Sequence, residues 1–333
     1  MQELTLILTH SQFCITTRVM VQISANKIVL LLIIVMGCNP APTDPFQSDV
    51  PLDHDAASHI LLQKNKQPLT YVMIEHDVKM KDYFDFIDRM ADEYIDSLVT
   101  FRDYLLVNAN PWIIDSLRNL NYYQQLKKGV FVYDQTQQVI LHAGDSILIP
   151  DLALIDSLSK RIKSSRIDVN LPEFKLRIIQ QHDTVLTCNI RIGQNKTKFL
   201  EYYQKEFDLR TPIGEGEIVT IRRNPKYIDL QTGEEYVETN RDDGRRTKMP
   251  IIPSLTPSIN GRVPGTLIHA TTNPKSLGKA YSHGCIGTSE PDIWSIFYYS
   301  PIGTRVTFRY DLEVKDEHGQ TIRLRDIYHR EAE

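Results

Sequence analysis

The chain has 333 residues, of which 41% are hydrophobic and 24% charged, a composition typical of a globular protein with one large domain or two modest ones. Its formal net charge of -4 gives no overall electrostatic reason to expect nucleic acid as a partner. The four cysteines are too few for the disulfide framework that small secreted domains use.

The apolar run IVLLLIIVM, residues 28–36, predicts a signal peptide. Lys27 precedes it, and the run is about half the ~20 residues that a membrane-spanning helix needs. The text VMGC resembles the lipobox of bacterial lipoproteins, in which the cysteine is diacylated and becomes the first mature residue. We therefore expect residues 1–38 to be a signal peptide with a lipobox and Cys38 to carry the lipid. An ordinary signal peptide with an incidental cysteine is the alternative, and Met20 would give a start of conventional length.

A tether and then a helical pattern follow the lipobox. The text NPAPTDPFQSDVPLDHD is rich in Pro, Asp and Ser, so we expect residues 39–75 to form an extended tether. Apolar residues recur at steps of three and four between residues 80 and 105, which predicts an amphipathic helix, continuous or interrupted.

Residues 76–165 are expected to form a mixed, largely helical region of unknown role. Asn110 and Pro111 are a preferred cap residue and first-turn residue, and they predict the start of a second helix. The stretch 129–150 alternates like two or three short strands, and apolar spacing predicts a third helix over residues 151–165.

The pattern changes to strands over residues 166–312, in the texts IDVNLPEFKLRII, TVLTCNIRIG, TPIGEGEIVTI and GTRVTFRYDLEV. We expect a mainly β domain, wrapped as a sandwich or barrel, and hence an α+β fold when the helical region is included. Cys188 lies in one alternating run and is predicted to face the core. Residues 313–333 are a predicted C-terminal extension.

Cys285 lies in the stretch YSHGCIGT, and His269 stands sixteen positions before it. The intervening TTNPKSLGKAYS contains Pro274 and Gly278, so it can fold as a loop that brings the two side chains together. Acyl transfer by cysteine needs a thiolate, and an adjacent imidazole can accept the thiol proton. The pair predicts a nucleophile at Cys285 and a general base at His269.

The residues around the cysteine also fit this chemistry. Gly284 and Gly287 let backbone amides approach a substrate carbonyl as an oxyanion hole. His283 either positions the loop or the substrate, or only makes structural hydrogen bonds. The text SEPD predicts a helix capped by Ser289, whose positive dipole end modestly favours a thiolate at Cys285.

Residues 169–309 resemble the L,D-transpeptidase catalytic domain, the YkuD-type family. The family signature is a histidine followed some fifteen positions later by Ser-His-Gly-Cys, and the chain has His269 and then the run from Ser282 to Cys285. The texts VNLPEFKLRII, TPIGEGEI and PIGTRVTF resemble the family's opening, glycine-containing and closing strands.

The resemblance implies a bacterial cell-wall enzyme without a cofactor. Family members attack the third-residue carbonyl of a tetrapeptide peptidoglycan stem, release D-alanine, hold the stem as a cysteine thioester and pass it to an amine, forming a 3-3 crosslink or attaching a protein. By this resemblance Cys285 is the nucleophile, His269 the base, the amides of Gly284 and Cys285 the oxyanion donors, and His283 a supporting residue. The implied partners are peptidoglycan stem peptides, carbapenem-type inhibitors and, through Cys38, a membrane of the cell envelope, with the catalytic domain facing the periplasm or wall.

Two positions depart from the family pattern. Gly287 replaces the arginine usual after Cys-Ile, whose contact is therefore absent or made from elsewhere, and Ala270 replaces a common glycine. The polar segment from Arg222 to Gly265 is a candidate substrate lid, although most charged loops are only solvated. We name Ser282 and Arg262 as candidate substrate-binding residues. The basic residues that could hold stem carboxylates are Arg241, Arg245, Arg246, Lys248 and Arg262.

Three alternatives stay open. With water as the acceptor, the same Cys/His pair makes an L,D-carboxypeptidase or a hydrolase. His269, His283 and Cys285 could instead hold a structural zinc, but no fourth ligand stands at a convincing spacing and we predict no metal. The last alternative is a non-catalytic wall-binding lipoprotein that keeps the fold, for which Gly287 is the only hint.

Overall fold

The structure is a computed structural model that describes residues 69–201, 204–229 and 233–330, together with short strands within residues 1–33. Met1–Lys66 and Gln67–Glu333 are separate compact units. Cys38 and residues 39–68 lie outside the described residues, so the lipobox and most of the tether stay predictions.

Among the described residues of the first unit, the strands pair with one another. Antiparallel pairing joins β1 to β4, β4 to β5 and β2 to β3. Their bounds are β1 (Leu4–Thr5), β2 (Thr9–His10), β3 (Phe13–Cys14), β4 (Arg18–Ser24) and β5 (Lys27–Ile33).

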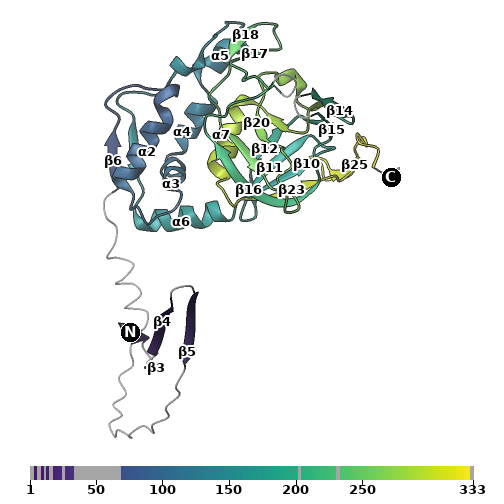
Figure 1. Ribbon diagram of the computed structural model, residues 1–333. Helices are drawn as coiled ribbons and strands as arrows, with labels where there is room; N and C mark the ends of the chain where they lie inside the picture. The colour runs from purple at the N-terminus through teal and green to yellow at the C-terminus, as the bar shows by residue number, and fades with distance from the viewer. Residues whose placement is uncertain are drawn as a thin grey trace. The chain divides into compact units, whose positions relative to one another are not determined.

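The larger unit begins with a helical region that also holds two antiparallel strand pairs, β6 with β9 and β7 with β8 (Figure 1). Since β6 starts at Thr70, the predicted tether over residues 39–75 is too long, and its last residues belong to the folded unit. The elements are β6 (Thr70–Met73), β7 (Val78–Lys79), η1 (Met80–Asp82), α2 (Tyr83–Tyr94), α3 (Arg102–Ala109), α4 (Pro111–Arg118), α5 (Asn121–Lys127), η2 (Gln135–Gln137), β8 (Val139–Leu141), β9 (Ser146–Ile149) and α6 (Leu152–Lys163).

The apolar pattern between residues 80 and 105 belongs to two helices, because Ile95 after α2 has an extended backbone with φ -118° and ψ 128°, and α3 starts only after Phe101, whose φ is 58°. Asn110 lies at the predicted start of α4, but its side chain makes no cap there. Its Nδ2 instead donates to the carbonyls of Leu106 and Leu148, at 2.8 and 2.9 Å. Asn110 therefore ties α3 to β9.

Residue 166 begins the strand-rich part, where eight strands form one mixed sheet in the order β12-β11-β10-β23-β16-β19-β20-β22 (Figure 1). This confirms an α+β fold with a mainly β domain. The elements are β10 (Arg166–Asn170), β11 (Lys175–Gln180), β12 (Asp183–Asn189), β13 (Ile192–Gly193), β14 (Thr197–Leu200), β15 (Lys205–Asp208), β16 (Gly214–Arg222), β17 (Glu238–Asn240), β18 (Arg246–Lys248), β19 (Ser254–Pro257), β20 (Ile268–Ala270), η4 (Pro274–Ser276), β21 (Ala280–Ser282), β22 (Ile286–Thr288), α7 (Glu290–Tyr299), β23 (Arg305–Arg309), β24 (Glu313–Lys315) and β25 (Thr321–Arg323).

The two edges of this sheet are joined by the chain that follows β12. Arg191 forms an antiparallel bridge with Gly287 of β22, and β13 pairs with β21 in parallel. Because β12 and β22 are the two outer strands, these contacts curl the sheet toward a closed barrel and cover an exposed edge.

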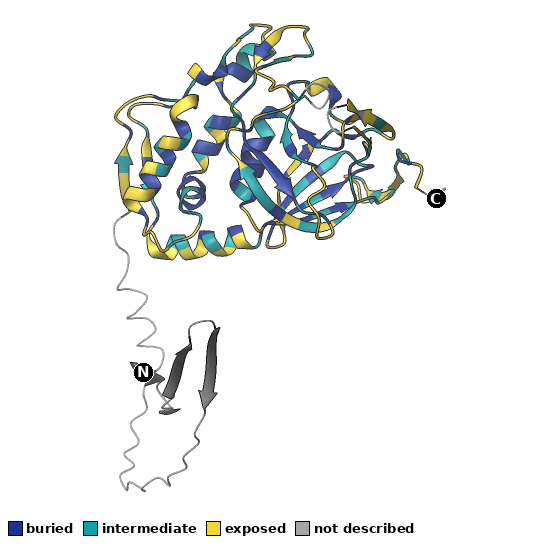
Figure 2. Ribbon diagram, in the orientation of Figure 1, coloured by how far each residue is buried: buried dark blue, intermediate teal, exposed yellow. Residues whose placement is uncertain are grey.

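Helix α7 joins the helical region to the sheet domain. Its Trp294, Phe297 and Tyr298 are buried in a hydrophobic core that includes residues from both parts (Figure 2). The hydroxyls of Tyr83 and Tyr298 are hydrogen-bonded at 2.6 Å, and Asn108 Nδ2 donates to the Tyr298 carbonyl at 2.9 Å. A domain boundary near residue 165 stays a prediction, since the core continues across it.

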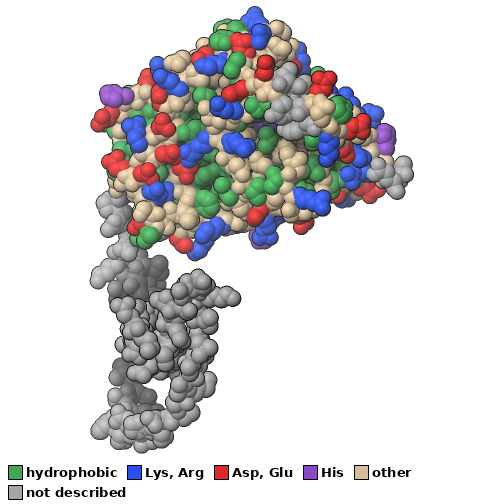
Figure 3. Space-filling view, viewed as in Figure 1, with side chains coloured by type: hydrophobic (Ala, Val, Ile, Leu, Met, Phe, Trp, Pro, Cys, Tyr) green, Lys and Arg blue, Asp and Glu red, His purple; other side chains and the backbone are tan. Residues whose placement is uncertain are grey.

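Three further features are the environment of Cys188, the distribution of surface charge and the length of the helices. Cys188 is buried in the core, as predicted. Positive and negative side chains lie side by side over the face seen in Figure 3. Within the described residues, no helix is both long and apolar enough to cross a membrane.

Candidate active site

His269 and Cys285 project from one face of the sheet. His269 lies on β20 and is paired in parallel with Gly287 on β22, while Cys285 comes two residues before Gly287. The Ile286 N–H donates to the Leu267 carbonyl at 2.8 Å, which extends this register to the cysteine. Since opposite residues and residues two apart point the same way in a pleated sheet, both side chains share a face on adjacent strands. The register thus places the predicted base and nucleophile on the same face of neighbouring strands.

The hydrogen bond at His269 identifies the nitrogen that can act as a base. Nδ1 lies 2.7 Å from the Ala270 carbonyl oxygen. A carbonyl can only accept, so Nδ1 carries the proton and Nε2 of the neutral ring has a free lone pair. Burial, reinforced by the positive charge of Arg191, lowers the pKa of His269 to about 4. The ring is therefore neutral at pH 7, as a proton acceptor must be.

Cys285 is partly exposed and is in its thiol form at rest. Burial raises the pKa of the thiol, while the backbone N–H of Leu267 and the charge of Arg191 oppose this by favouring the thiolate. The resting pair is consequently a neutral thiol beside a neutral imidazole, and the thiolate forms when the proton moves.

The loop before the cysteine is fixed through its carbonyls. Gly284 has φ 102°, a conformation that other residues rarely adopt, and its carbonyl accepts from Thr211 Oγ1 at 3.1 Å. In a trans peptide the C=O and N–H point in opposite directions, so the Cys285 N–H is turned away from buried Thr211. Ser282 Oγ donates to the Cys285 carbonyl at 2.6 Å. Ser282, predicted to bind substrate, is buried and positions this loop.

The other predicted residues near the cysteine have different surroundings. His283 is exposed, and its pKa is lowered by partial burial and by Lys198, Lys196 and Arg191. The predicted cap is confirmed, because Ser289 Oγ accepts from the Asp292 N–H at 3.1 Å at the start of α7.

Most basic residues of the predicted lid have partners within the protein. Arg241 Nη1 lies 3.0 Å from Glu290 and 2.5 Å from the Tyr122 hydroxyl, and its side chain is only 9% exposed. The remaining contacts join Arg245 to the ring of Phe131, Arg246 to Glu238 and Lys248 to Asp134. Exposed Arg262 lies in a turn paired with Ile259, and no contact among the described residues joins it to the cysteine or the base.

Two residues near the pair were missed by sequence reasoning. The ring of Tyr227 lies 5.7 Å from the ring of His269, and burial followed by the charge of Cys285 raises its pKa. Arg191 interacts electrostatically with both His269 and Cys285. For Tyr227 the only local signal is an aromatic residue two positions after Pro225 of the Asn224-Pro225 turn. Arg191 stands in a strand pattern without any such signal.

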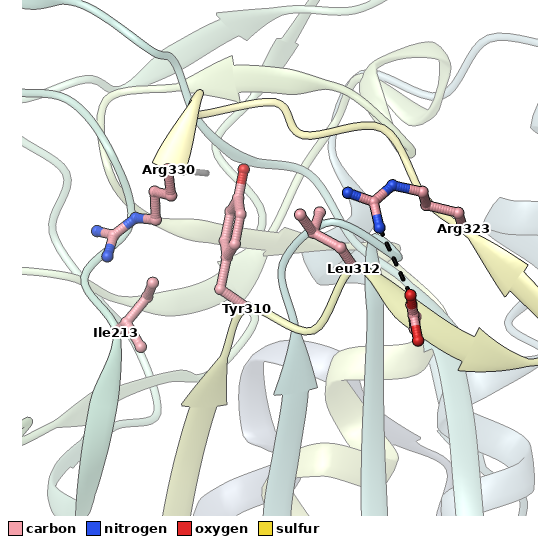
Figure 4. A pocket seen from close by; sticks show the side chains of 6 residues that line it. Ile213, Tyr310, Leu312, Arg323 and Arg330 are labelled. Carbon is pink, nitrogen blue, oxygen red and sulfur yellow. Dashed lines mark hydrogen bonds and ion pairs between the residues drawn. The ribbon is translucent and has the colours of Figure 1, made fainter. Parts of the chain in front are cut away.

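A cavity of about 330 Å³ lies between the polar segment and the loop that joins the base to the cysteine, and neither His269 nor Cys285 is among its lining residues. Residues of the polar segment, including Asp242, line one side, and residues of the loop between the base and the cysteine, including Ser276 and Tyr281, line the other. A larger, more open hollow of about 530 Å³ lies beside the C-terminal extension (Figure 4). Its lining includes Tyr310 and Arg323 but no predicted site residue.

The geometry gives no support to a zinc site. In the described part of the chain, no three His, Cys, Asp or Glu side chains gather in a way that could hold a metal ion.

Comparisons with known proteins point to one family. The family model of the YkuD L,D-transpeptidase catalytic domain matches residues 164–308. A Bacillus licheniformis protein named L,D-transpeptidase YkuD is 30% identical over 165 residues, which are 50% of this chain and 74% of that protein.

Solved structures of lower similarity carry related names. An L,D-transpeptidase from Mycobacterium smegmatis is 16% identical with a TM-score of 0.30, and the match covers 44% of this chain and 58% of that one. The catalytic domain of an E. faecium L,D-transpeptidase, solved as acylated by ertapenem, is 19% identical with a TM-score of 0.30. The match covers 44% of this chain and 97% of that one. The chain thus spans less than two thirds of the mycobacterial protein.

The fold and the site define an α+β protein whose mainly β domain presents a cysteine and a neutral histidine on one face of adjacent strands. The family match covers this domain, including both residues of the pair. The chain belongs to the L,D-transpeptidase catalytic domain family, because its Bacillus relative is 30% identical over most of that relative's length. Family membership supports an enzyme. The helical region before residue 164 lies outside the matched residues.

Proposed function

We propose that the protein is a cysteine-dependent L,D-transpeptidase that acts on peptidoglycan stem peptides. The observation that carries the proposal is the pair itself: Cys285 and His269 share a face, and the hydrogen bond from Nδ1 leaves Nε2 of His269 free to accept a proton. Membership of the family supports the substrate class, a tetrapeptide stem with a terminal D-alanine.

The proposed reaction has two transfers. His269 Nε2 takes the thiol proton as Cys285 Sγ bonds to the third-residue carbonyl carbon, and the Cys285 N–H faces the developing oxyanion. The bond to D-alanine breaks, the imidazolium returns its proton to the leaving amine, and a thioester remains. An acceptor amine then gives a proton to His269 and attacks the thioester, which releases the crosslinked product and the thiol.

The proposed location is the bacterial cell envelope, with a lipid anchor on Cys38 and the catalytic domain facing the periplasm or wall. The support is the VMGC sequence after an apolar run. Labelling of cells with radioactive palmitate tests this. Label on the parent chain and none on Cys38→Ala is expected, whereas equal label on both excludes this anchor.

Mass spectrometry of the protein with tetrapeptide stems and with a carbapenem tests the proposed activity. We expect a stem acyl group on Cys285, a dimeric product and a carbapenem adduct on the same residue. Cys285→Ala abolishes both adducts, and His269→Ala slows their formation about 10²–10⁴-fold because the thiol loses its proton acceptor.

Circular dichroism of both variants provides the control for folding. A tripeptide product without dimer identifies water as the acceptor and a carboxypeptidase. A folded parent protein that forms no adduct with either reagent contradicts the proposed activity and favours a non-catalytic role.

A further inference from the structure

Gly287 lies between Arg191 and His269. On one side the Arg191 N–H donates to the Gly287 carbonyl at 2.8 Å and the Gly287 N–H donates back at 3.0 Å. On the other side Gly287 is paired with His269 in parallel. Arg191 and His269 thus flank the same residue of β22, and residues directly opposite each other project to the same face of a sheet. Cys285, two residues earlier, shares that face.

The side chain of Arg191 lies across the place where a side chain at position 287 would stand. A Cβ atom built on Gly287 would be 2.5 Å from Arg191 Nε and 2.7 Å from its Cγ, distances that non-bonded atoms do not tolerate. Position 287 is where similar domains usually carry an arginine after Cys-Ile. Here Arg191 occupies that space from the chain after β12, so any side chain at position 287 would have to displace it.

The guanidinium of Arg191 has no carboxylate partner among the ion pairs of the described residues. Its Nη1 lies 3.4 Å from Ser276 Oγ, and its buried Nε has no hydrogen-bond partner. A largely buried cation with no carboxylate at ion-pair distance costs stability, which favours a role in the site's chemistry. An anion that forms next to it would be its partner.

The charged and titratable groups around the pair come from several elements. Arg191 is the cation that acts on both members, and it lowers the pKa of both Cys285 and His269. Tyr227 contacts the imidazole and is itself protonated at neutral pH, because burial raises its pKa. The other groups that interact with Arg191 are exposed His283 and two residues that line the cavity of about 330 Å³, Tyr281 and Asp242.

We propose that Arg191 is the positioning residue of this site that stabilises the anionic sulfur of Cys285 and holds His269 neutral, in place of an arginine at position 287. The inference rests on the proposed function only in taking Cys285 as the nucleophile. Its test needs no stem peptide, so a failure of the proposed activity is distinguishable from a failure of this assignment.

Alkylation of Cys285 by iodoacetamide measures the thiolate directly. In the full chain, peptide-level mass spectrometry gives the rate for Cys285 between pH 6 and 10, with buried Cys188 as an internal thiol that stays unreactive while the protein is folded. We expect Cys285 of Arg191→Met to be alkylated about three- to tenfold more slowly at pH 8. This change in rate corresponds to a rise of up to about one unit in the pKa of Cys285. Arg191→Lys keeps the charge and is expected within about twofold of the parent.

If Arg191 only supported the packing, its replacement would shift the pKa of Cys285 in the opposite direction. Burial is the main cause that raises the pKa of Cys285, so a variant that merely loosened the packing would lower this pKa and speed alkylation. Loss of the positive charge of Arg191, in contrast, raises the pKa of Cys285. Arg191→Met reacting as fast as the parent or faster, or Arg191→Lys reacting as slowly as Arg191→Met, overturns the proposal.

A double variant that moves the arginine from position 191 to position 287 tests where the cation must stand. Arg191→Gly with Gly287→Arg returns a guanidinium to the same face from β22 and is expected to recover most of the lost rate, whereas Arg191→Gly alone stays slow. A double variant that is folded by circular dichroism and no faster than Arg191→Gly contradicts the assignment. Arg323→Met, which removes an exposed arginine paired with Glu313 in the C-terminal extension, is the matched control and leaves the rate unchanged.

Discussion

At the scale of single residues, the decisive feature is the proton on His269. The bond to the Ala270 carbonyl fixes the tautomer, while burial and Arg191 keep the ring neutral. Sequence spacing predicted the residue, but not its protonation. Protonation depends on the dielectric surroundings and on a cation from a distant strand, and neither is written in the local sequence.

This proton state gives a prediction for a titration of the folded protein. The histidine NMR signals of the parent, assigned with His269→Gln, should show a midpoint near pH 4 for His269. In urea the same residue should titrate near pH 6.5, the ordinary value. Because the unfolded chain then binds more protons between these values, the contribution of His269 to stability falls as the pH decreases from about 6.5 to 4. A folded-state midpoint near 6.5 would contradict the assigned environment.

At the scale of elements, the polar segment is attached to the helical region and to α7. Arg241 bonds to Tyr122 of α5 and Glu290 of α7, and Arg223 Nη2 pairs with Asp103 of α3 at 2.6 Å. The sequence offered two interpretations of this segment, a substrate lid whose basic residues hold stem carboxylates or a solvated charged loop. A charge pattern does not reveal whether its partner is a ligand or another part of the same chain.

The Arg241–Glu290 pair gives the prediction at this scale. Glu290 is 4% exposed, so Arg241→Met leaves an unpaired buried carboxylate and is expected to cost about 3–5 kcal/mol in urea unfolding. Burial raises the pKa of Glu290 and Arg241 opposes the rise, so without Arg241 the carboxyl is protonated more readily and the loss is smaller at pH 5 than at pH 8.

Two variants control this measurement. Arg241→Met with Glu290→Gln is expected to recover part of the stability, since no charge stays buried. Arg246→Met breaks an ion pair whose arginine is 69% exposed and should change stability by less than about 1 kcal/mol. Equal effects of Arg241→Met and Arg246→Met would show that burial does not decide the strength of these pairs.

At the scale of the whole molecule, the helical region and the sheet domain share α7. Tyr104 packs against Phe297 and Tyr298 at ring-centroid distances of 5.1 and 5.8 Å, and Tyr83 approaches Trp294 at 6.3 Å. These aromatic contacts bury apolar surface between the two parts. The family match leaves the helices out, whereas the core includes them.

A pair of truncated chains tests this dependence. Residues 69–333 should unfold in one cooperative transition, while residues 166–333 should lack one and expose apolar surface to a hydrophobic dye, because the core face of α7 is uncovered. Differential scanning calorimetry and dye binding measure both. A sharp transition in the shorter chain, with Cys285 still acylated by a carbapenem, would show that the helical region is dispensable for folding.

The sequence by itself determined the features that depend on local pattern and spacing. These are the strand-rich domain, the Ser289 cap, buried Cys188 and the histidine–cysteine pair, whose register follows from two short strands and the loop between them. Only the tertiary structure decided that Arg191 occupies the space above Gly287, that Tyr227 contacts His269 and that Arg241 is buried. The reason is physical: burial and electrostatic partners arise when distant segments pack together, and no stretch of one strand or loop contains them.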